Sequence, residues 1–327
     1  MVYYLETKST DPYYNLAFEE YVLTHRTEGD YLLLWQNDNT IVVGQNQNTE
    51  AEINRAFVEE HHINVVRRGT GGGAVYHDLG NLNYSFITDV GDDGISIRRF
   101  TQPVVAALRS LGLNAEASGR NDILVEGRKV SGTAQRRHAG RILHHGTLLF
   151  DANPGMVAGA LNVDPEKFRS KSTKSVRARI GNIRDFLPVD MDLPAFWTYL
   201  KDALSGGGLT PDALTADELA AVECLKTEKY DTWAWNYGRS PKFDVTRKRY
   251  WDGGCLEASV SIADGRITDI RFCGDFLAVR DMDALLAALK GTAYRPEAVR
   301  PVLEASPVAE LFGAITADEV IVTLFDL

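Results

Sequence analysis

The sequence contains little cysteine, no long apolar run and no long run of basic residues. Its three cysteines, Cys224, Cys255 and Cys273, include no C-x-x-C pair, so neither a disulfide framework nor a zinc site is indicated, and a reducing compartment is favoured. No stretch approaches the roughly 18 apolar residues of a membrane span. The formal net charge is −10 and the basic clusters are short, which excludes the basic face of a general nucleic-acid binder.

The composition is that of an ordinary globular protein. Hydrophobic residues make up 44% and charged residues 24%, and 327 residues are enough for two domains with a core each. The first thirty residues hold Glu6, Lys8, Asp11, Glu19 and Glu20 in place of an unbroken apolar core, so no signal peptide is expected. We therefore predict a cytoplasmic protein with no membrane or nucleic-acid partner.

Glycine, by contrast, is concentrated in one short segment. Residues 67–83 read RRGTGGGAVYHDLGNLN and follow an apolar, strand-like run. Glycine permits positive φ and lets backbone N–H groups approach an anion, while arginine supplies a permanently charged fork for phosphate or carboxylate. The segment therefore predicts an anion-binding loop between two strands.

The same residues can be compared with two known nucleotide-binding motifs and with a glycine-rich hairpin that binds no ligand. Residues 69–74 fit the dinucleotide fingerprint G-x-G-x-x-A, but that motif requires a helix to follow, and the pattern after Ala74 indicates two strands around a turn. A Walker loop is excluded because the chain has no G-K-[ST]. On the loop alone, a glycine-rich hairpin without a ligand stays open.

Periodicity and turn residues predict the elements and two domains. Asp11-Pro12 begins a helix that runs to about residue 25, with Asp at the N-cap and Pro at the first helical position. An Asp264-Gly265 turn joins two strands. We place the domain boundary between residues 243 and 244. The remaining predicted strands are 31–35, 40–43, 63–67, 74–77, 82–88, 121–125, 128–134, 142–150, 255–262, 266–273 and one near 319–325. The remaining predicted helices are 50–61, 100–111, several within 154–226, 281–290 and 295–304.

Six further blocks, together with the glycine loop, carry a resemblance to a known family. They are residues 11–20 (DPYYNLAFEE), 119–123 (GRNDI), 128–132 (RKVSG), 144–149 (HHGTLL), 174–180 (KSVRARI) and 235–238 (WNYG). In this order they resemble the lipoate-protein ligase family, in its single-chain form, over nearly the whole chain. The resemblance implies an α+β fold with a catalytic domain of the biotin/lipoate ligase (class II synthetase-like) type over 1–243. This domain has mixed sheets with flanking helices, and a small C-terminal α+β domain follows over 244–327.

The resemblance implies an ATP-dependent ligase that works in two steps. Lipoate and ATP give lipoyl-AMP and pyrophosphate, with Mg²⁺ as cofactor, and the lipoyl group then passes to a lysine of a lipoyl domain. The implied acceptors are E2 subunits of 2-oxoacid dehydrogenases and the glycine cleavage H protein. The alternatives are a non-catalytic lipoyl-domain or nucleotide-binding paralogue, and an octanoyltransferase of the same fold. The octanoyltransferase needs a cysteine nucleophile, and residues 1–223 contain none.

The site residues follow by matching the blocks. Lys129 and Arg68 are the expected catalytic residues, because attack of a carboxylate on phosphorus brings two anions together and requires fixed positive charge. Asn121-Asp122 places an amide beside a carboxylate, which suits Mg²⁺ next to ATP phosphates; an Asx turn is the alternative. The expected ATP- and lipoate-binding residues are Arg68, Gly72, Gly73, Ala74, Val75, Tyr76, His77, Asn81, Asn83, Asn121, Asp122, Lys129, Ser131, Gly132, His145, Gly146, Ser175, Val176 and Arg177. Gly69-Thr70 departs from the serines that many members carry.

Overall fold

The computed structural model describes residues 2–91, 96–161, 180–206, 208–237 and 244–325. Its strands are β1 Val2–Leu5, β2 Asp30–Trp35, β3 Thr40–Val43, β4 Asn64–Arg67, β5 Val75–His77, β6 Asn81–Asp89, β7 Ala115–Ser118, β8 Asp122–Val125, β9 Arg128–His138, β10 Arg141–Leu149, β11 Leu209–Pro211, β12 Val245–Trp251, β13 Gly254–Ala263 and β14 Arg266–Gly274. Its helices are α1 Pro12–His25, α2 Thr49–Glu52, α3 Arg55–Glu60, α4 Ile97–Ser110, α5 Pro154–Ala160, η2 Ile183–Phe186, α7 Leu193–Leu204, α8 Ala216–Leu225, η3 Lys226–Tyr230, α9 Trp233–Asn236, α10 Asp283–Leu289, α11 Pro296–Glu304, α12 Val308–Phe312 and α13 Ala317–Phe325.

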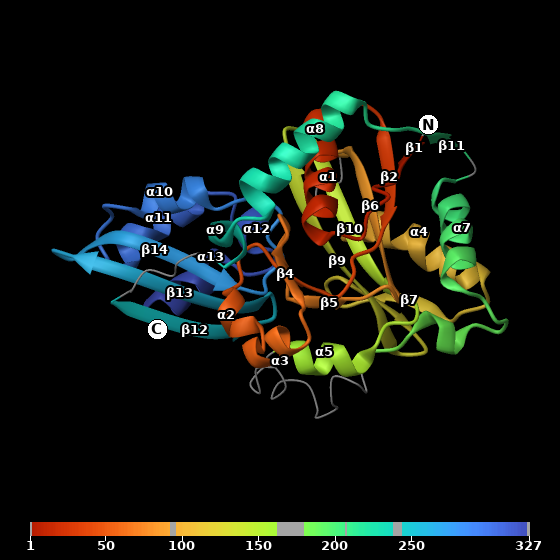
Figure 1. The fold of residues 1–327 in the computed structure, drawn as a ribbon. Helices are drawn as coiled ribbons and strands as arrows, with labels where there is room; N and C mark the ends of the chain where they lie inside the picture. Colours follow the sequence, from red (N-terminus) through yellow and green to blue (C-terminus); the bar gives the residue numbers. More distant parts are fainter. Residues whose placement is uncertain (1, 92–95, 162–179, 207, 238–243, 326–327) are drawn as a thin grey trace.

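A mixed eight-stranded sheet forms the centre of the molecule (Figure 1), with the strand order β11-β1-β2-β6-β10-β9-β8-β7. Strand β2 shows how the sheet is covered on both faces. Leu32 and Leu34 pack in the cluster that contains helices α4 and α7, whereas Leu33 and Trp35 pack in the cluster that contains α1 and α8. Because successive strand residues point to opposite faces, an apolar run such as this one belongs to a strand that is buried on both sides.

Two smaller sheets complete the fold. Strands β4-β3-β5 form one of them, and its β4 to β5 connection is the glycine loop. Strands β12-β13-β14 form the other at the far left of Figure 1, where they pack with helices α10 to α13. Residues of this last hydrophobic cluster all lie between 251 and 325, while the exact boundary at 243/244 stays a prediction.

The first helix begins where its sequence predicts. The Asp11 carboxylate accepts hydrogen bonds from the backbone N–H groups of Tyr13 and Tyr14, and Pro12 occupies the first turn. Asn15, Leu16 and Glu19 of this helix are all buried. Their burial places two polar side chains of α1 against the middle of the protein.

Most other predicted elements are confirmed, and the differences are as follows. The helix predicted at 50–61 is two short helices, because the Asn54 side chain accepts from the Phe57 N–H and starts a second one. Strands β1, β7 and β11 were not predicted. Strand β12 was also missed: it is an edge strand that carries Arg247, Lys248 and Arg249, and charged residues at an edge hide the strand pattern. In the C-terminal hairpin, Asp264 (φ 50°) and Gly265 (φ 71°) form the predicted turn.

The strand predicted near 319–325 is wrong, because these residues form helix α13. The run Val320-Ile321-Val322-Thr323 is β-branched and resembles a strand. A capping box overrides that preference: the Thr316 hydroxyl accepts from the Glu319 N–H, and the Glu319 carboxylate accepts from the Thr316 N–H.

We expect Thr316→Ala to lower the free energy of unfolding by about 1 kcal/mol, because the first turn of α13 loses its cap. Thr316→Ser keeps a hydroxyl and should be close to wild type. Urea denaturation of the three proteins measures the difference, and equal midpoints for all three would contradict the capping role.

Within the described ranges, no helix combines the length and the apolarity that a bilayer crossing requires. Ser175, Val176 and Arg177, and most of the block at 174–180, lie outside the described residues.

Candidate functional site

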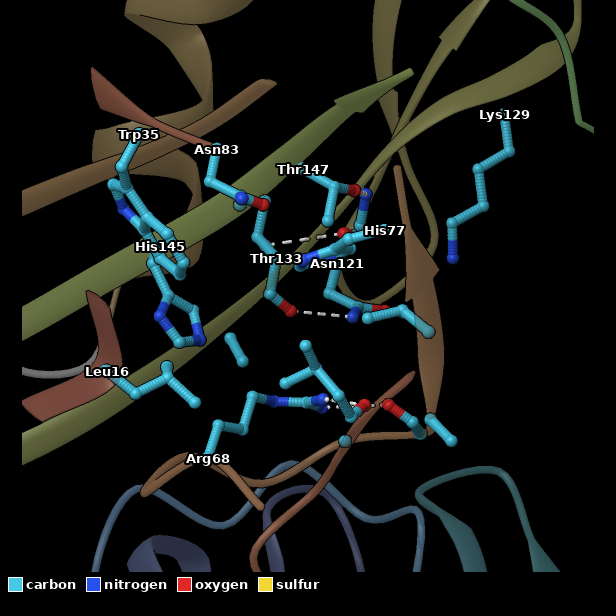
Figure 2. Close-up of a pocket in the computed structure, with 18 residues that line it drawn as sticks. Leu16, Trp35, Arg68, His77, Asn83, Asn121, Lys129, Thr133, His145 and Thr147 are labelled. Carbon is cyan, nitrogen blue, oxygen red and sulfur yellow. Dashed lines mark hydrogen bonds between the residues drawn. The ribbon is translucent and has the colours of Figure 1, made fainter. Parts of the chain in front are cut away.

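A pocket lies between the large sheet, helix α1 and the glycine loop (Figure 2). Its wall comes from segments far apart in the chain. In Figure 2, Lys129 lies on the opposite side of the pocket from Leu16 and Trp35. The lining residues are Leu16, Trp35, Val42, Arg68, Gly72, Gly73, Ala74, Val75, His77, Asn83, Asn121, Lys129, Gly132, Thr133, Ala134, His145, Gly146 and Thr147.

Arg68 is buried in this wall and holds the glycine loop in shape. Its Nε donates to Thr70 Oγ1 (2.9 Å) and its Nη1 to the Val42 carbonyl (3.1 Å). Its Nη2 donates to the carbonyls of Gly71 (2.7 Å) and Gly73 (2.8 Å). Burial lowers the pKa of Arg68 to about 10, so the guanidinium stays charged at pH 7. The loop therefore surrounds a fixed positive charge.

Part of the glycine loop binds the C-terminal region. The Gly71 N–H donates to the Ala278 carbonyl (3.2 Å), and the Gly72 N–H donates to the Phe276 carbonyl (3.0 Å). A Cβ atom at Gly71 would lie 2.6 Å from the Ala278 nitrogen, so this approach requires glycine. In this arrangement the Gly72 N–H is therefore bound within the protein, while Gly72 itself lines the pocket.

Lys129 reaches the pocket from the hairpin of β8 and β9. Its Nζ lies 2.7 Å from Asp122 Oδ1, and about a third of each side chain is exposed. Asp122 itself is outside the pocket lining. The carboxylate assigned to Mg²⁺ thus neutralises the lysine. A single carboxylate that is paired with an ammonium does not form a magnesium site by itself, and no group of three His, Cys, Asp or Glu side chains suited to a metal occurs in the described part of the chain.

His145 belongs to a buried chain of hydrogen bonds behind the pocket. Its Nδ1 lies 2.9 Å from Glu19 Oε1, and its Nε2 lies 2.8 Å from Thr70 Oγ1. Glu19 also accepts from the Ser85 hydroxyl (2.6 Å), which accepts from Trp35 Nε1 (2.9 Å). These contacts tie one apolar wall residue, Trp35, to the loop that Arg68 shapes.

Among the predicted residues that the structure describes, four lie outside the pocket lining: Tyr76, Asn81, Asp122 and Ser131. Tyr76 points to the other face of β5, where its hydroxyl donates to Asn39 Oδ1 (3.0 Å). Asn81 contacts the pocket residue Asn83: its Nδ2 donates a hydrogen bond to Asn83 Oδ1 (3.0 Å).

A bulge explains the position of Ser131. Ile123 pairs with Ser131 and Leu124 pairs with Lys129, so Val130 is an extra residue in β9. The bulge shifts the alternation of the strand, and Lys129 and Gly132 both line the pocket while Ser131 does not.

Six residues that line the pocket were not predicted from the sequence. They are Leu16, Trp35, Val42, Thr133, Ala134 and Thr147. Leu16 lies within the block at 11–20, and Thr147 follows His145 at period two, so both had a local signal. Trp35 and Val42 look like ordinary core residues.

The cysteines are remote from this site. Cys224 is exposed on α8, whereas Cys255 and Cys273 are buried in β13 and β14. None of the three lines the pocket. The pocket therefore offers no thiolate for acyl transfer.

Comparison with known proteins agrees with this arrangement. The family model of the lipoyl protein ligase A/B catalytic domain matches residues 11–205, and that of the bacterial lipoate protein ligase C-terminus matches residues 240–324. The lipoate-protein ligase LplJ of Bacillus subtilis is 43% identical over 315 residues, covering 94% of this chain and 95% of its own length. Lipoate-protein ligase 1 of Staphylococcus aureus is 42% identical over 317 residues, covering 95% and 96%.

Solved structures show the same fold. P. falciparum LipL1 in complex with lipoate has a TM-score of 0.80 at 24% identity and covers 100% of this chain and 99% of its own. The bipartite lipoate protein ligase of Thermoplasma acidophilum, solved with its E2 lipoyl domain, has a TM-score of 0.64 at 31% identity and covers 75% and 98%. A lipoate-protein ligase A bound with ATP has a TM-score of 0.64 at 28% identity and covers 72% and 98%. The chain therefore belongs to the lipoate-protein ligase family, and it is a ligase.

Proposed function

We propose that the protein activates lipoate with ATP to lipoyl-AMP and then transfers the lipoyl group to a lysine of a lipoyl domain. One observation carries the proposal: the Lys129 ammonium and the Arg68-shaped glycine loop line the same pocket. A related ligase binds ATP and another is solved with an E2 lipoyl domain, which supports both halves of the reaction.

The first step joins two groups that repel each other. The carboxylate oxygen of lipoate attacks the α-phosphorus of ATP, the bond between the α- and β-phosphates breaks, and pyrophosphate leaves. Lys129, held by Asp122, contributes a partly exposed positive charge, and Arg68 contributes a buried one in the wall. Charges that are in place beforehand stabilise the transition state without reorganisation.

The rest of the substrate needs an apolar surface. Leu16, Trp35, Val42 and Ala134 line the pocket, and Leu16 and Trp35 lie across it from Lys129 (Figure 2). We place the lipoyl tail along these side chains with its carboxylate toward Lys129. Burial of four methylenes contributes about 3 kcal/mol at ~0.8 kcal/mol each.

The proposal extends to the acceptor proteins, the cellular location and the metal ion. We expect E2 lipoyl domains and the glycine cleavage H protein to be modified, and we expect a cytoplasmic location. Mg²⁺ would enter with the phosphates of ATP, since Asp122 pairs with Lys129 and the described residues around it do not form a metal site of their own.

An exchange assay tests the function. Purified protein should exchange pyrophosphate into ATP only when lipoate or octanoate is present, because the adenylate forms reversibly from the acid. Subsequent addition of an E2 lipoyl domain should yield a lipoylated lysine, visible as a mass shift. Absence of acid-dependent exchange would reject adenylation, and exchange without transfer would reject the acceptor assignment.

A further inference from the structure

Helix α1 supports two histidines of the pocket wall through different side chains. Asn15 contacts Asn37, which contacts His77, while Glu19 contacts His145 directly. Asn15 and Glu19 lie four residues apart on one face of the helix, and both are buried. The arrangement fixes which nitrogen of each ring carries a proton.

The orientation of the first chain follows from two backbone carbonyls. Asn15 Nδ2 lies 3.1 Å from the Ser9 carbonyl oxygen and 2.7 Å from that of Gln36, and carbonyl oxygens only accept. The same nitrogen lies 3.0 Å from Asn37 Oδ1, so its two hydrogens are shared among three oxygen acceptors. With its oxygen toward Asn15, the Asn37 amide presents its nitrogen to His77 Nδ1 at 3.2 Å. An amide N–H only donates, and His77 Nδ1 must therefore be an unprotonated acceptor.

A neutral His77 consequently carries its proton on Nε2. Burial, followed by the nearby Arg68 and His145, lowers the pKa of His77 to about 3, so the ring is neutral at pH 7. The side chain is 3% exposed, and no protein group of the described ranges contacts Nε2 within hydrogen-bond distance. A buried donor without an acceptor is unfavourable, and a bound acceptor would relieve this cost.

His145 shows the opposite arrangement. Arg68 Nε donates to the Thr70 hydroxyl, so this hydroxyl can donate to His145 Nε2, and His145 Nδ1–H donates to Glu19. Both nitrogens of His145 are thus used within the protein. Of these two histidines, His77 is the one with a ring nitrogen that has no partner among the described residues, and that nitrogen is a donor.

A second spare donor lies in the same wall. Asn83 Oδ1 accepts from Asn81, and its buried Nδ2 has no partner among the described residues. Two neutral donors accompany the cations Lys129 and Arg68 in this lining. Such a set suits an acceptor oxygen that carries negative charge.

We propose that His77 donates its Nε2–H to a carboxylate oxygen of the acid substrate, and that Asn37, oriented by Asn15, is the positioning residue that fixes this tautomer. The proposal rests on the proposed activation of lipoate. It adds a neutral hydrogen bond to the charged contacts already described, and it gives two buried residues, Asn15 of the first block and Asn37, a role at the site.

The tautomer can be read directly by NMR. In protein labelled with ¹⁵N-histidine, two-bond ¹H–¹⁵N correlations should show His77 with a protonated Nε2 and an unprotonated Nδ1, the signals being assigned by their loss in His77→Gln. In Asn37→Asp the carboxylate can only accept, so Nδ1 should become protonated. Asn54→Asp, at the N-cap of α3, makes the same change of charge away from the pocket and should leave the pattern unchanged. A protonated Nδ1 in the wild type would overturn the proposal.

The substrate contact is tested by a matched pair at position 77. His77→Met removes the donor and should weaken lipoate binding, measured calorimetrically without ATP, by about 10- to 100-fold. His77→Gln has similar length, keeps an amide donor and should stay within a few fold of wild type. The KM for ATP should be unchanged in both.

The outcomes separate this proposal from the proposed function. A folded His77→Met that binds lipoate like the wild type would overturn the donor role while the exchange assay still supports adenylation. A wild-type protein without acid-dependent exchange would remove adenylation and the substrate contact together, and the NMR pattern would then describe only the fold.

Discussion

Replacing Lys129 by alanine is expected to lower lipoate-dependent pyrophosphate exchange by about 10²–10³-fold, because one preorganised charge is lost at the reacting oxyanions. The fold should be little affected, since the Lys129–Asp122 pair is about a third exposed and exposed pairs contribute ~0–1 kcal/mol. Exchange rates at saturating ATP and lipoate measure the first effect, and thermal melting measures the second.

A matched lysine provides the control. Lys290 also pairs with an aspartate, Asp269, at 2.8 Å, and it lies in the C-terminal region. Lys290→Ala removes the same charge and an equivalent ion pair, so its exchange rate should equal that of the wild type. If Lys129→Ala retains wild-type exchange, or if both variants lose it equally, Lys129 has no specific role in adenylation.

Replacing Arg68 by alanine is expected to reduce both activity and stability. The guanidinium donates to three carbonyl oxygens and one hydroxyl, and its loss leaves buried acceptors unpaired at about 1–3 kcal/mol each. We expect unfolding to become easier by about 3 kcal/mol or more and acid-dependent exchange to fall by at least ~10²-fold. Chemical denaturation and the exchange assay measure the two effects.

One further variant separates the effect of the Arg68 charge from that of its planar shape, and a second serves as a surface control. Arg68→Lys keeps a positive charge but cannot form the planar fork, so it should recover only part of the lost exchange. Arg300→Ala removes an exposed arginine paired with Asp318 and should leave both measurements unchanged. Wild-type exchange in Arg68→Ala would rule out the loop as the site of activation.

Local sequence signals predicted the elements on which the site is built. The N-cap Asp11, the glycine run after Arg68 and the alternating strands around it each act over a few residues, so the sequence reveals them. The same locality explains the error at α13, where a β-branched run masked a capping box at Thr316 and Glu319.

Contacts between distant segments could not be predicted in this way. Lys129 pairs with Asp122 across a hairpin whose register shifts at Val130. The hydrogen bond from the Gly72 N–H to the Phe276 carbonyl joins residues about two hundred positions apart. Trp35 has the pattern of a core residue, yet it lines the pocket. Such features follow from packing and from hydrogen-bond geometry, neither of which has a fixed sequence spacing.

For this protein, the amino-acid sequence by itself determined the family, the order of most strands and helices, and the residues of the glycine loop. Only the tertiary structure decided which residues of that loop line the pocket, which carboxylate neutralises Lys129, and which side chain contacts His77 Nδ1. The reason is physical: backbone preferences act between neighbours, whereas the state of a buried polar group depends on every partner that folding brings within about 3 Å of it.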